Sequence, residues 1–231
     1  MIVVVKALFF DLSDTLQDFD WEKQWKLLIP LVNKELNTSI SVQDFKQKYQ
    51  QCYEVYRLGH LTNDELFFDL LFKQLAVETT PAQIKQIAKK HLEIRKEYTW
   101  LPEEYDETLQ ELGKHFKLAI VSSGVFPWGY YDYEKIFGFK MDKHFDLLVT
   151  SFDHGYLKDS GKLFPIALKK LKLTPSEVAF VGNSYEDDVL LAKKFGFKTV
   201  FLNKKNENLK GDLTIRKLSD LRGLVTRLKE L

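Results

Sequence analysis

The sequence predicts an α/β protein in which a parallel sheet with flanking helices forms the core and an all-helical domain is inserted near the amino terminus. Two observations predict this arrangement. Apolar runs typical of strands alternate with helical segments after residue 99, and one such run opens the chain. Between these parts, residues 18–98 have helical periodicity without a convincing strand. We therefore expect residues 1–17 and 99–231 to form the core domain and residues 18–98 to form the inserted domain.

The predicted strands are short apolar runs that end at polar or turn residues. Residues 2–10 are rich in β-branched and aromatic side chains and stop at Asp11, as expected of a parallel strand buried on both faces. The strand at 198–202 is the last clear one, and we interpret the basic tail after Leu202 as a solvated helix face and not as a nucleic-acid patch. The other expected strands and the helices between them lie at residues 117–121, 145–150, 163–171, 178–181 and 187–195.

The inserted segment contains clear helix signals. Asp20 is placed to cap a first helix, which Pro30 should kink or end. Thr80 and Pro81 form an N-cap followed by proline at the first helical position. One face of another predicted helix carries four residues at spacings of four, three and four: Phe45, Tyr49, Cys52 and Tyr56.

Composition and charge exclude several function classes. Lys and Arg total 34 against 33 Asp and Glu, so the formal net charge of +1 lacks the basic footprint of a dedicated nucleic-acid binder. The single cysteine, Cys52, cannot form an internal disulfide or a cysteine-rich zinc site. No apolar run approaches the ~20 residues of a membrane span, and the amino-terminal run is expected to be a strand and not a signal peptide. We expect a cytoplasmic protein without a membrane or nucleic-acid partner.

Polar residues follow three of the predicted strands. Asp11–Thr15 follow the first, Ser122–Gly124 follow the strand after the insertion, and Gly182–Ser184 follow a later one, with Glu186–Asp188 close behind. In open α/β sheets ligands bind beyond the carboxyl ends of the strands, so these clusters should meet at one edge. They offer carboxylates for a hard cation and hydroxyls for an oxyanion, and Lys158 could add a positive charge.

These residues also carry a family resemblance. Four segments resemble, in order and spacing, the four motifs of the haloacid dehalogenase (HAD) superfamily: Phe9–Leu16, Leu118–Gly124, Lys158–Phe164 and Val181–Val189. The resemblance covers nearly the whole chain and implies a Rossmann-like core with an inserted helical cap. It also implies a hydrolase, most simply a phosphatase that acts on a small phosphorylated substrate.

The resemblance implies a role for each matching residue. Asp11 would be the nucleophile, and Mg²⁺ would be held by Asp11, the backbone carbonyl of Ser13 and the side chain of Asn183. Asp188, or else Asp187, would hold the waters of the metal or Lys158. The residues that would contact the substrate phosphate are Thr15, Ser122, Ser123, Gly124 and Lys158. Phe126 and Trp128 are candidates for lining the pocket.

Two residues depart seriously from the family pattern, whereas Asp14 in place of glycine and Asp159 in place of proline are mild changes. Ser13 stands where the phosphatases usually carry the Asp that acts as general acid and base, a role that typically contributes 10²–10⁴-fold in rate. Asn183 replaces a charged metal ligand with a neutral one, which should lower Mg²⁺ affinity. Three interpretations follow. We favour a slow or specialised phosphatase over a 2-haloacid dehalogenase-like hydrolase, which would need an arginine such as Arg57 or Arg95 for the substrate carboxylate. The third is a binding protein without catalysis.

Each residue also has a purely structural explanation. Asp11 could cap a turn, and Lys158 alone would most often be a solvated surface lysine. Glu186–Asp188 could be the acidic first turn of a helix, which favours the helix dipole and is compatible with a functional role.

Overall fold

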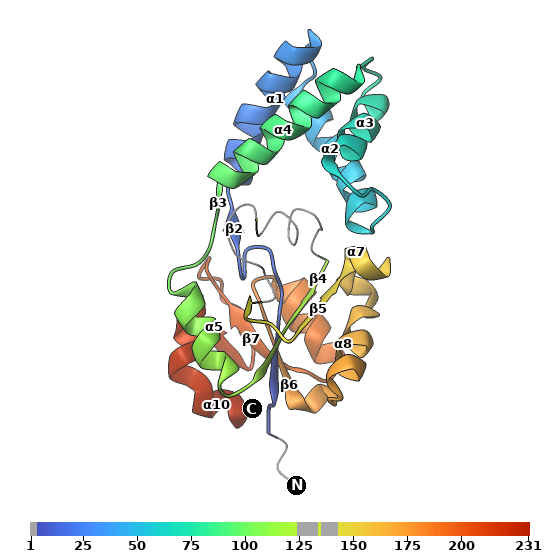
Figure 1. Ribbon diagram of the computed structural model, residues 1–231. Coiled ribbons are helices and arrows are strands. Elements are labelled where there is room, and N and C mark those ends of the chain that lie inside the picture. Colours follow the sequence, from blue (N-terminus) through green and yellow to red (C-terminus); the bar gives the residue numbers. More distant parts are fainter. Residues whose placement is uncertain (1–3, 124–133, 135–142) are drawn as a thin grey trace. The chain divides into compact units, whose positions relative to one another are not determined.

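The computed structural model describes residues 4–123, 134 and 143–231 of the 231-residue chain (Figure 1). The chain divides into two compact units. Met1–Asp18 and Leu101–Leu231 form the first, which we call the core unit. Phe19–Trp100 form the second, which we call the helical unit.

The core unit is built on a parallel sheet. Among the described residues the sheet has six strands in the order β5-β4-β1-β6-β7-β8, and every neighbouring pair is parallel. This confirms the predicted α/β class. The strands are β1 (Ala7–Phe10), β4 (Lys117–Ser122), β5 (Leu147–Thr150), β6 (Val178–Gly182), β7 (Lys198–Leu202) and β8 (Leu213–Ile215).

Alternate residues of β1 enter two separate hydrophobic clusters. Leu8 and Phe10 pack in one cluster with residues of the helices α5 (Tyr105–Gly113) and α10 (Val225–Lys229). Ala7 and Phe9 pack in the other cluster with residues of α8 (Leu163–Leu171) and α9 (Leu191–Lys194). The sheet is therefore covered on both faces, as its continuous apolar strands require (Figure 1). Polar side chains are left for the strand ends.

The described part of the core unit also contains short helices. They are α7 (Ser151–His154), the 3₁₀ turns η2 (Lys158–Ser160), η3 (Pro175–Glu177) and η5 (Leu218–Leu224), and the π-helical turn η4 (Tyr185–Leu190), which continues into α9.

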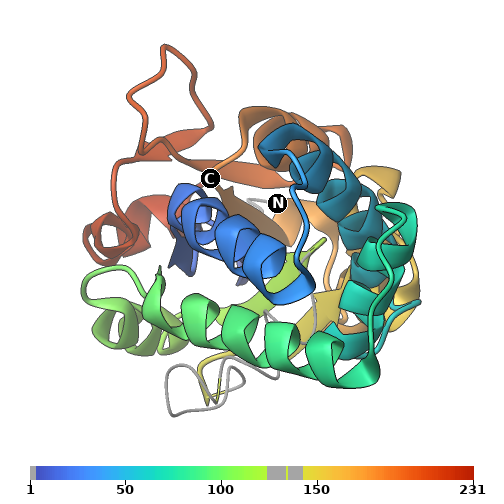
Figure 2. The same ribbon diagram turned by 90° about the horizontal axis from the view of Figure 1, so that it is seen from above.

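The helical unit consists of α1 (Trp21–Leu36), α2 (Val42–Arg57), α3 (Asp64–Gln74) and α4 (Pro81–Glu97). The predicted caps are confirmed: the Asp20 carboxylate accepts a hydrogen bond from the backbone N of Lys23 at 2.9 Å, and Thr80 begins a capping box. Figure 2 shows α4 lying beside α1. The core of this unit is aromatic, with ring contacts such as Tyr49–Phe67 at 4.8 Å.

Three expectations need correction. Of the kink or end predicted at Pro30, the end is wrong. α1 continues past this proline because it is exposed, so the carbonyl that loses its partner can face water, while Leu28, Ile29 and Val32 keep the helix packed. The stretch 18–98 includes the start of a two-stranded ribbon, β2 (Asp18–Phe19) paired with β3 (Thr99–Trp100). The tail after Leu202 is not merely a solvated helix face, because β8, η5 and α10 all bury leucines in the sheet cluster.

Within the described ranges, no helix combines the length and the apolar character needed to cross a membrane.

Candidate active site

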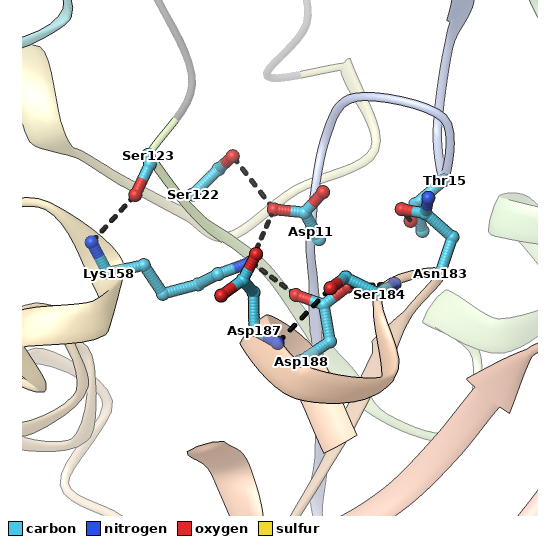
Figure 3. Close-up of polar contacts among 9 residues, drawn as sticks. All are labelled: Asp11, Thr15, Ser122, Ser123, Lys158, Asn183, Ser184, Asp187 and Asp188. Atoms are coloured by element: carbon cyan, nitrogen blue, oxygen red, sulfur yellow. Dashed lines mark hydrogen bonds and ion pairs between the residues drawn. The ribbon is translucent and has the colours of Figure 1, made fainter. Parts of the chain in front are cut away.

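The order of the sheet brings three polar strand ends together. β1 lies between β4 and β6, with Phe10 in register with Ile120 on one side and Val181 on the other. Asp11 follows β1 directly, and its backbone N donates to the carbonyl of Val181 at 2.9 Å. Ser122 is the last residue of β4. The carboxylate of Asp11 is therefore fixed beside the end of β4 (Figure 3).

One oxygen of Asp11 accepts two side-chain hydrogen bonds. The hydroxyl of Ser122 donates to Oδ1 at 3.0 Å, and the ammonium of Lys158 donates to the same oxygen at 2.7 Å. Asp11 is 8% exposed and Lys158 is 5% exposed, so these contacts are largely shielded from water. The structure thus brings Asp11, Ser122 and Lys158 together, and Lys158 is not a surface lysine.

Lys158 is held at both its backbone and its side chain. Its backbone N donates to the hydroxyl of Ser123 at 2.7 Å, which ties the start of η2 to the end of β4. Its Nζ also donates to Oδ1 of Asp188. Burial alone would lower the pKa of Lys158, but the two carboxylates outweigh burial and raise that pKa above its ordinary value. The ammonium therefore stays charged.

The structure distinguishes Asp188 from Asp187. Asp188 is 1% exposed, and its Oδ2 accepts from the backbone N of Ser184 at 2.8 Å. Asp187 is exposed, and its own backbone N donates to the Ser184 hydroxyl at 3.1 Å. Burial raises the pKa of Asp188 to about 6, opposed by Lys158 and reinforced by the charge of Asp11. Asp188 is therefore the carboxylate that pairs with Lys158.

Ser184 is a residue to which sequence reasoning gave no role. Its hydroxyl is the N-cap of η4, and its backbone N holds Asp188. The signal was present in the sequence, since Ser184 stands three residues before Asp187, the spacing of an N-cap serine and the N3 amide.

Thr15 and Asn183 form a second polar contact at the same edge. The hydroxyl of Thr15 donates to Oδ1 of Asn183 at 2.9 Å, and the side chain of Thr15 is fully buried. In this structure Thr15 contacts Asn183 and is buried, and its expected contact with the substrate phosphate stays a prediction.

Ser13 lies on the loop that connects Asp11 and Thr15. Its side chain is exposed, and the next residue, Asp14, adopts the left-handed conformation with φ of 57°. The backbone N of Asp14 closes the turn on the carbonyl of Gln17 at 2.7 Å. Asp is among the residues that tolerate this conformation, so the turn forms without glycine. Gly124, Phe126 and Trp128, also expected at the site, lie outside the described residues.

The oxygen atoms of the site are suitable ligands for Mg²⁺, although they carry little negative charge. Ser122 and Lys158 both use Oδ1 of Asp11, which leaves Oδ2 open within the described residues. Oδ1 of Asn183 keeps a second lone pair beside the Thr15 contact. In the part of the chain that the structure describes, no three His, Cys, Asp or Glu side chains are grouped to hold a metal ion. Mg²⁺ is commonly bound by one or two carboxylates together with waters and a substrate phosphate, a requirement that this site meets.

The two arginines considered for a substrate carboxylate both have partners within the helical unit. Arg57 forms an ion pair with Glu54 at 2.6 Å. The Arg95 guanidinium lies 3.9 Å from the ring centroid of Phe19, and the residue is 5% exposed. These contacts count against the dehalogenase interpretation.

Comparisons with known proteins agree with the four motifs. Residues 5–196 match the family of haloacid dehalogenase-like hydrolases. A glyceraldehyde 3-phosphate phosphatase from Pyrococcus furiosus is 28% identical, over 98% of this chain and 91% of the relative. A solved 2-haloacid dehalogenase from Pseudomonas syringae has a TM-score of 0.69 at 20% identity, over 96% of this chain and 99% of that one. A HAD family enzyme from Bacteroides thetaiotaomicron, in complex with magnesium and inorganic phosphate, has a TM-score of 0.67 at 15% identity, over 88% of this chain and 97% of that one.

The chain therefore belongs to the haloacid dehalogenase-like hydrolases. The resemblance read from the motifs is confirmed, and so is the hydrolase class. The two solved structures share the fold with this chain. At identities of 15–20%, this similarity supports a conclusion about the fold alone.

Proposed function

We propose that the protein hydrolyses small phosphate monoesters with Asp11 as the nucleophile and Mg²⁺ as the cofactor. The observation that carries this proposal is the fixed carboxylate of Asp11, whose Oδ1 accepts from Ser122 and Lys158 while Oδ2 has no hydrogen bond to the described residues. A nucleophile needs one oxygen with a free lone pair and a defined direction. The other oxygen then serves to hold the carboxylate in place.

In the first step, Oδ2 of Asp11 would attack phosphorus. A bond forms between this oxygen and phosphorus, and the bond between phosphorus and the ester oxygen breaks. With substrate present, the single hydroxyl proton of Ser122 would turn from Oδ1 of Asp11 to a phosphate oxygen, while Lys158 keeps its hydrogen bond to Oδ1. The ammonium of Lys158 would also stabilise the negative charge that collects on the transferring group. The departing alkoxide takes its proton from solvent water. In the second step, water attacks the phosphorus of the acyl phosphate, the bond between phosphorus and Oδ2 of Asp11 breaks, and inorganic phosphate leaves. The proton that the attacking water gives up returns to solvent and balances the one taken up by the alkoxide, and the carboxylate is restored.

Mg²⁺ would be held by Asp11, the backbone carbonyl of Ser13 and Asn183, with Asp187 nearby for its waters. When bound, it supplies positive charge that offsets the repulsion between a carboxylate and a phosphate. Because Asp11 is the only charged side chain among the three direct ligands, we propose that the ion binds best together with a phosphorylated substrate.

Ser13 sets the expected speed and substrate range. The hydroxyl of serine is too weak an acid to protonate a departing alkoxide, so alkyl phosphates should react slowly. Aryl phosphates, whose leaving group needs less help from a proton, should react faster. Among alkyl esters, glyceraldehyde 3-phosphate is the first to test, since the Pyrococcus furiosus relative is named for it.

The test is phosphate release by the purified protein with Mg²⁺ and with a chelator. The substrates are an aryl phosphate and a panel of small sugar and triose phosphates. We expect metal-dependent release that Asp11→Asn abolishes. Asp159→Asn is the matched control, because Asp159 is exposed on the turn that carries Lys158. Release that survives Asp11→Asn, or no release from any substrate, would overturn the proposal.

Ser13 also keeps the dehalogenase alternative open to test, because halide leaves without a proton. That alternative predicts halide release from a 2-haloacid that a chelator does not affect. The engagement of Arg57 and Arg95 within the helical unit is the observation against it.

A further inference from the structure

Gly182, the last residue of β6, lies in contact distance of Asp188. A Cβ added to Gly182 would lie 2.5 Å from the Cβ of Asp188, and closer still to its Cγ and Oδ2. These are the three nearest atoms, and all belong to one side chain. Gly182 is not among the residues with positive φ, so its backbone conformation is open to any amino acid. Glycine is needed at this position because a side chain would occupy the space that Asp188 fills.

Asp188 has little freedom to give way. Its Oδ1 binds the Nζ of Lys158, and its Oδ2 accepts from the backbone N of Ser184 at 2.8 Å. The residue is 1% exposed. A methyl group at position 182 would therefore have to move the side chain away from Lys158 or move the start of η4.

We propose that Gly182 is a positioning residue for the Lys158–Asp188 pair. Because position 182 lacks a side chain, η4 can fold back onto the end of β6, and Asp188 can reach the ammonium that also holds Asp11. The steric part of this inference stands on the packing alone. Its consequence for catalysis rests on the proposed function.

The substitution Gly182→Ala should release Lys158 from one of its two carboxylates. The ammonium would then shift relative to Asp11 and to the transferring phosphoryl group. A misplacement of about 1 Å at a reacting group can reduce the rate by about 10²-fold. We expect kcat to fall by about that factor, with a much smaller change in KM, because the loss concerns the transition state.

The experiment compares Gly182→Ala with Gly223→Ala in the full chain. A Cβ at Gly223 meets no atom within 4 Å among the described residues, so this variant controls for the added methyl group. The first measurement is the acylation rate of Lys158 by acetic anhydride, followed by peptide mass spectrometry with the exposed Lys162 as internal reference. We expect a several-fold rise for Gly182→Ala and no change for Gly223→Ala. The second measurement is kcat and KM.

The two readouts separate the two proposals. Faster acylation of Lys158 in a protein without phosphatase activity supports the positioning role and removes the proposed function. Unchanged acylation in a folded Gly182→Ala variant overturns the positioning role, whatever the activity.

If Gly182→Ala does not fold, the double variant with Asp188→Gly decides. The three atoms nearest to the added Cβ all belong to Asp188, so removing that side chain should restore folding. A double variant that fails to fold although Asp188→Gly alone folds would show that other neighbours forbid the methyl group, and the proposal would be wrong.

Discussion

Replacing Lys158 with methionine tests whether this lysine neutralises two buried carboxylates. The variant keeps the apolar stem and the backbone hydrogen bond to Ser123, and it removes the ammonium that binds Asp11 and Asp188. We expect the free energy of unfolding to fall by about 3 kcal/mol at about pH 7.5.

The magnitude follows from the contacts that are lost. Each hydrogen bond to a charged group contributes about 1.5–3 kcal/mol, and Lys158 makes two of them. Removing one partner of a buried ion pair typically costs about 3–5 kcal/mol, because the remaining charge is left without compensation. For a chain of this size, about 3 kcal/mol corresponds to a fall in Tm of about 6–12 °C.

The loss should depend on pH, with a definite sign. Burial and Asp11 already raise the pKa of Asp188 to about 6, and Lys158 opposes that rise, so removing Lys158 should raise this pKa further. A carboxyl group whose pKa is higher in the folded state than in the unfolded chain stabilises the folded state. This contribution is complete below the pKa of the unfolded chain and is lost as the pH rises through the pKa of the folded state. At about 1.4 kcal/mol per pH unit, the cost of Lys158→Met should be about 2 kcal/mol smaller at pH 5 than at pH 7.5.

The assay is urea unfolding followed by circular dichroism at both pH values. Lys162→Met is the matched control, since Lys162 lies on the same segment and is exposed. A loss below about 1 kcal/mol at pH 7.5, or a loss of equal size at both pH values, would refute the charge argument.

Three further predictions concern single residues. Ser13→Asp should raise kcat toward alkyl phosphates by on the order of 10²-fold, since Ser13 is exposed and an acid there can protonate the leaving group; steady-state kinetics with an alkyl and an aryl phosphate check this. Asn183→Asp should tighten Mg²⁺ binding about tenfold by adding a charged ligand, and Glu186→Gln should not; calorimetric Mg²⁺ titration is the measurement. Full burial lowers the pKa of His91 below its usual 6.5, although Asp64 opposes this. The free energy of unfolding should therefore decrease as the pH falls below 6.5, by up to about 1.4 kcal/mol per pH unit. Urea midpoints measured against pH should show this decrease in the natural protein and a smaller one in His91→Gln.

Most of the core sheet could be predicted because its strands are continuous apolar runs that end at polar residues. β7 matches the predicted residues 198–202, and α8 matches the predicted 163–171. β8 was not predicted because it has three residues, of which Leu213 and Ile215 are buried and the middle one is exposed. An alternation of three residues is too short to predict a strand from the sequence, and pairing with β7 stabilises this one.

The same limit explains why α1 does not end at Pro30, one of the two outcomes predicted there. A proline within a helical pattern normally predicts an end, because it removes one hydrogen bond and crowds the preceding turn. In α1 the buried residues Leu28, Ile29 and Val32 stand on both sides of it. Tertiary packing of this face outweighs the local cost, and no local pattern contains that information.

At the site, the sequence could predict which strand ends converge but not which acid faces inward. Asp187 and Asp188 are adjacent and both match the spacing of the motif. Their different burial depends on the π-helical turn and on the space above Gly182, both of which are tertiary features. The hydrogen bond from Thr15 to Asn183 joins residues 168 positions apart, so it too was beyond a reading of local pattern.

The two departures from the family pattern affect different parts of the reaction. Ser13 removes a proton donor for the leaving group, whereas Asn183 removes negative charge around the metal. Neither changes the contacts that fix Asp11, since Ser122 and Lys158 both remain on its Oδ1. With Lys158 between Asp11 and Asp188, these three side chains carry one net negative charge, so the site still favours a cation beside any phosphate that enters. The chemistry that such a site retains is transfer to the carboxylate, and the chemistry that it has weakened is protonation of the leaving group. Substrates should therefore be ranked by the acidity of their leaving groups, a dependence that Ser13→Asp should flatten.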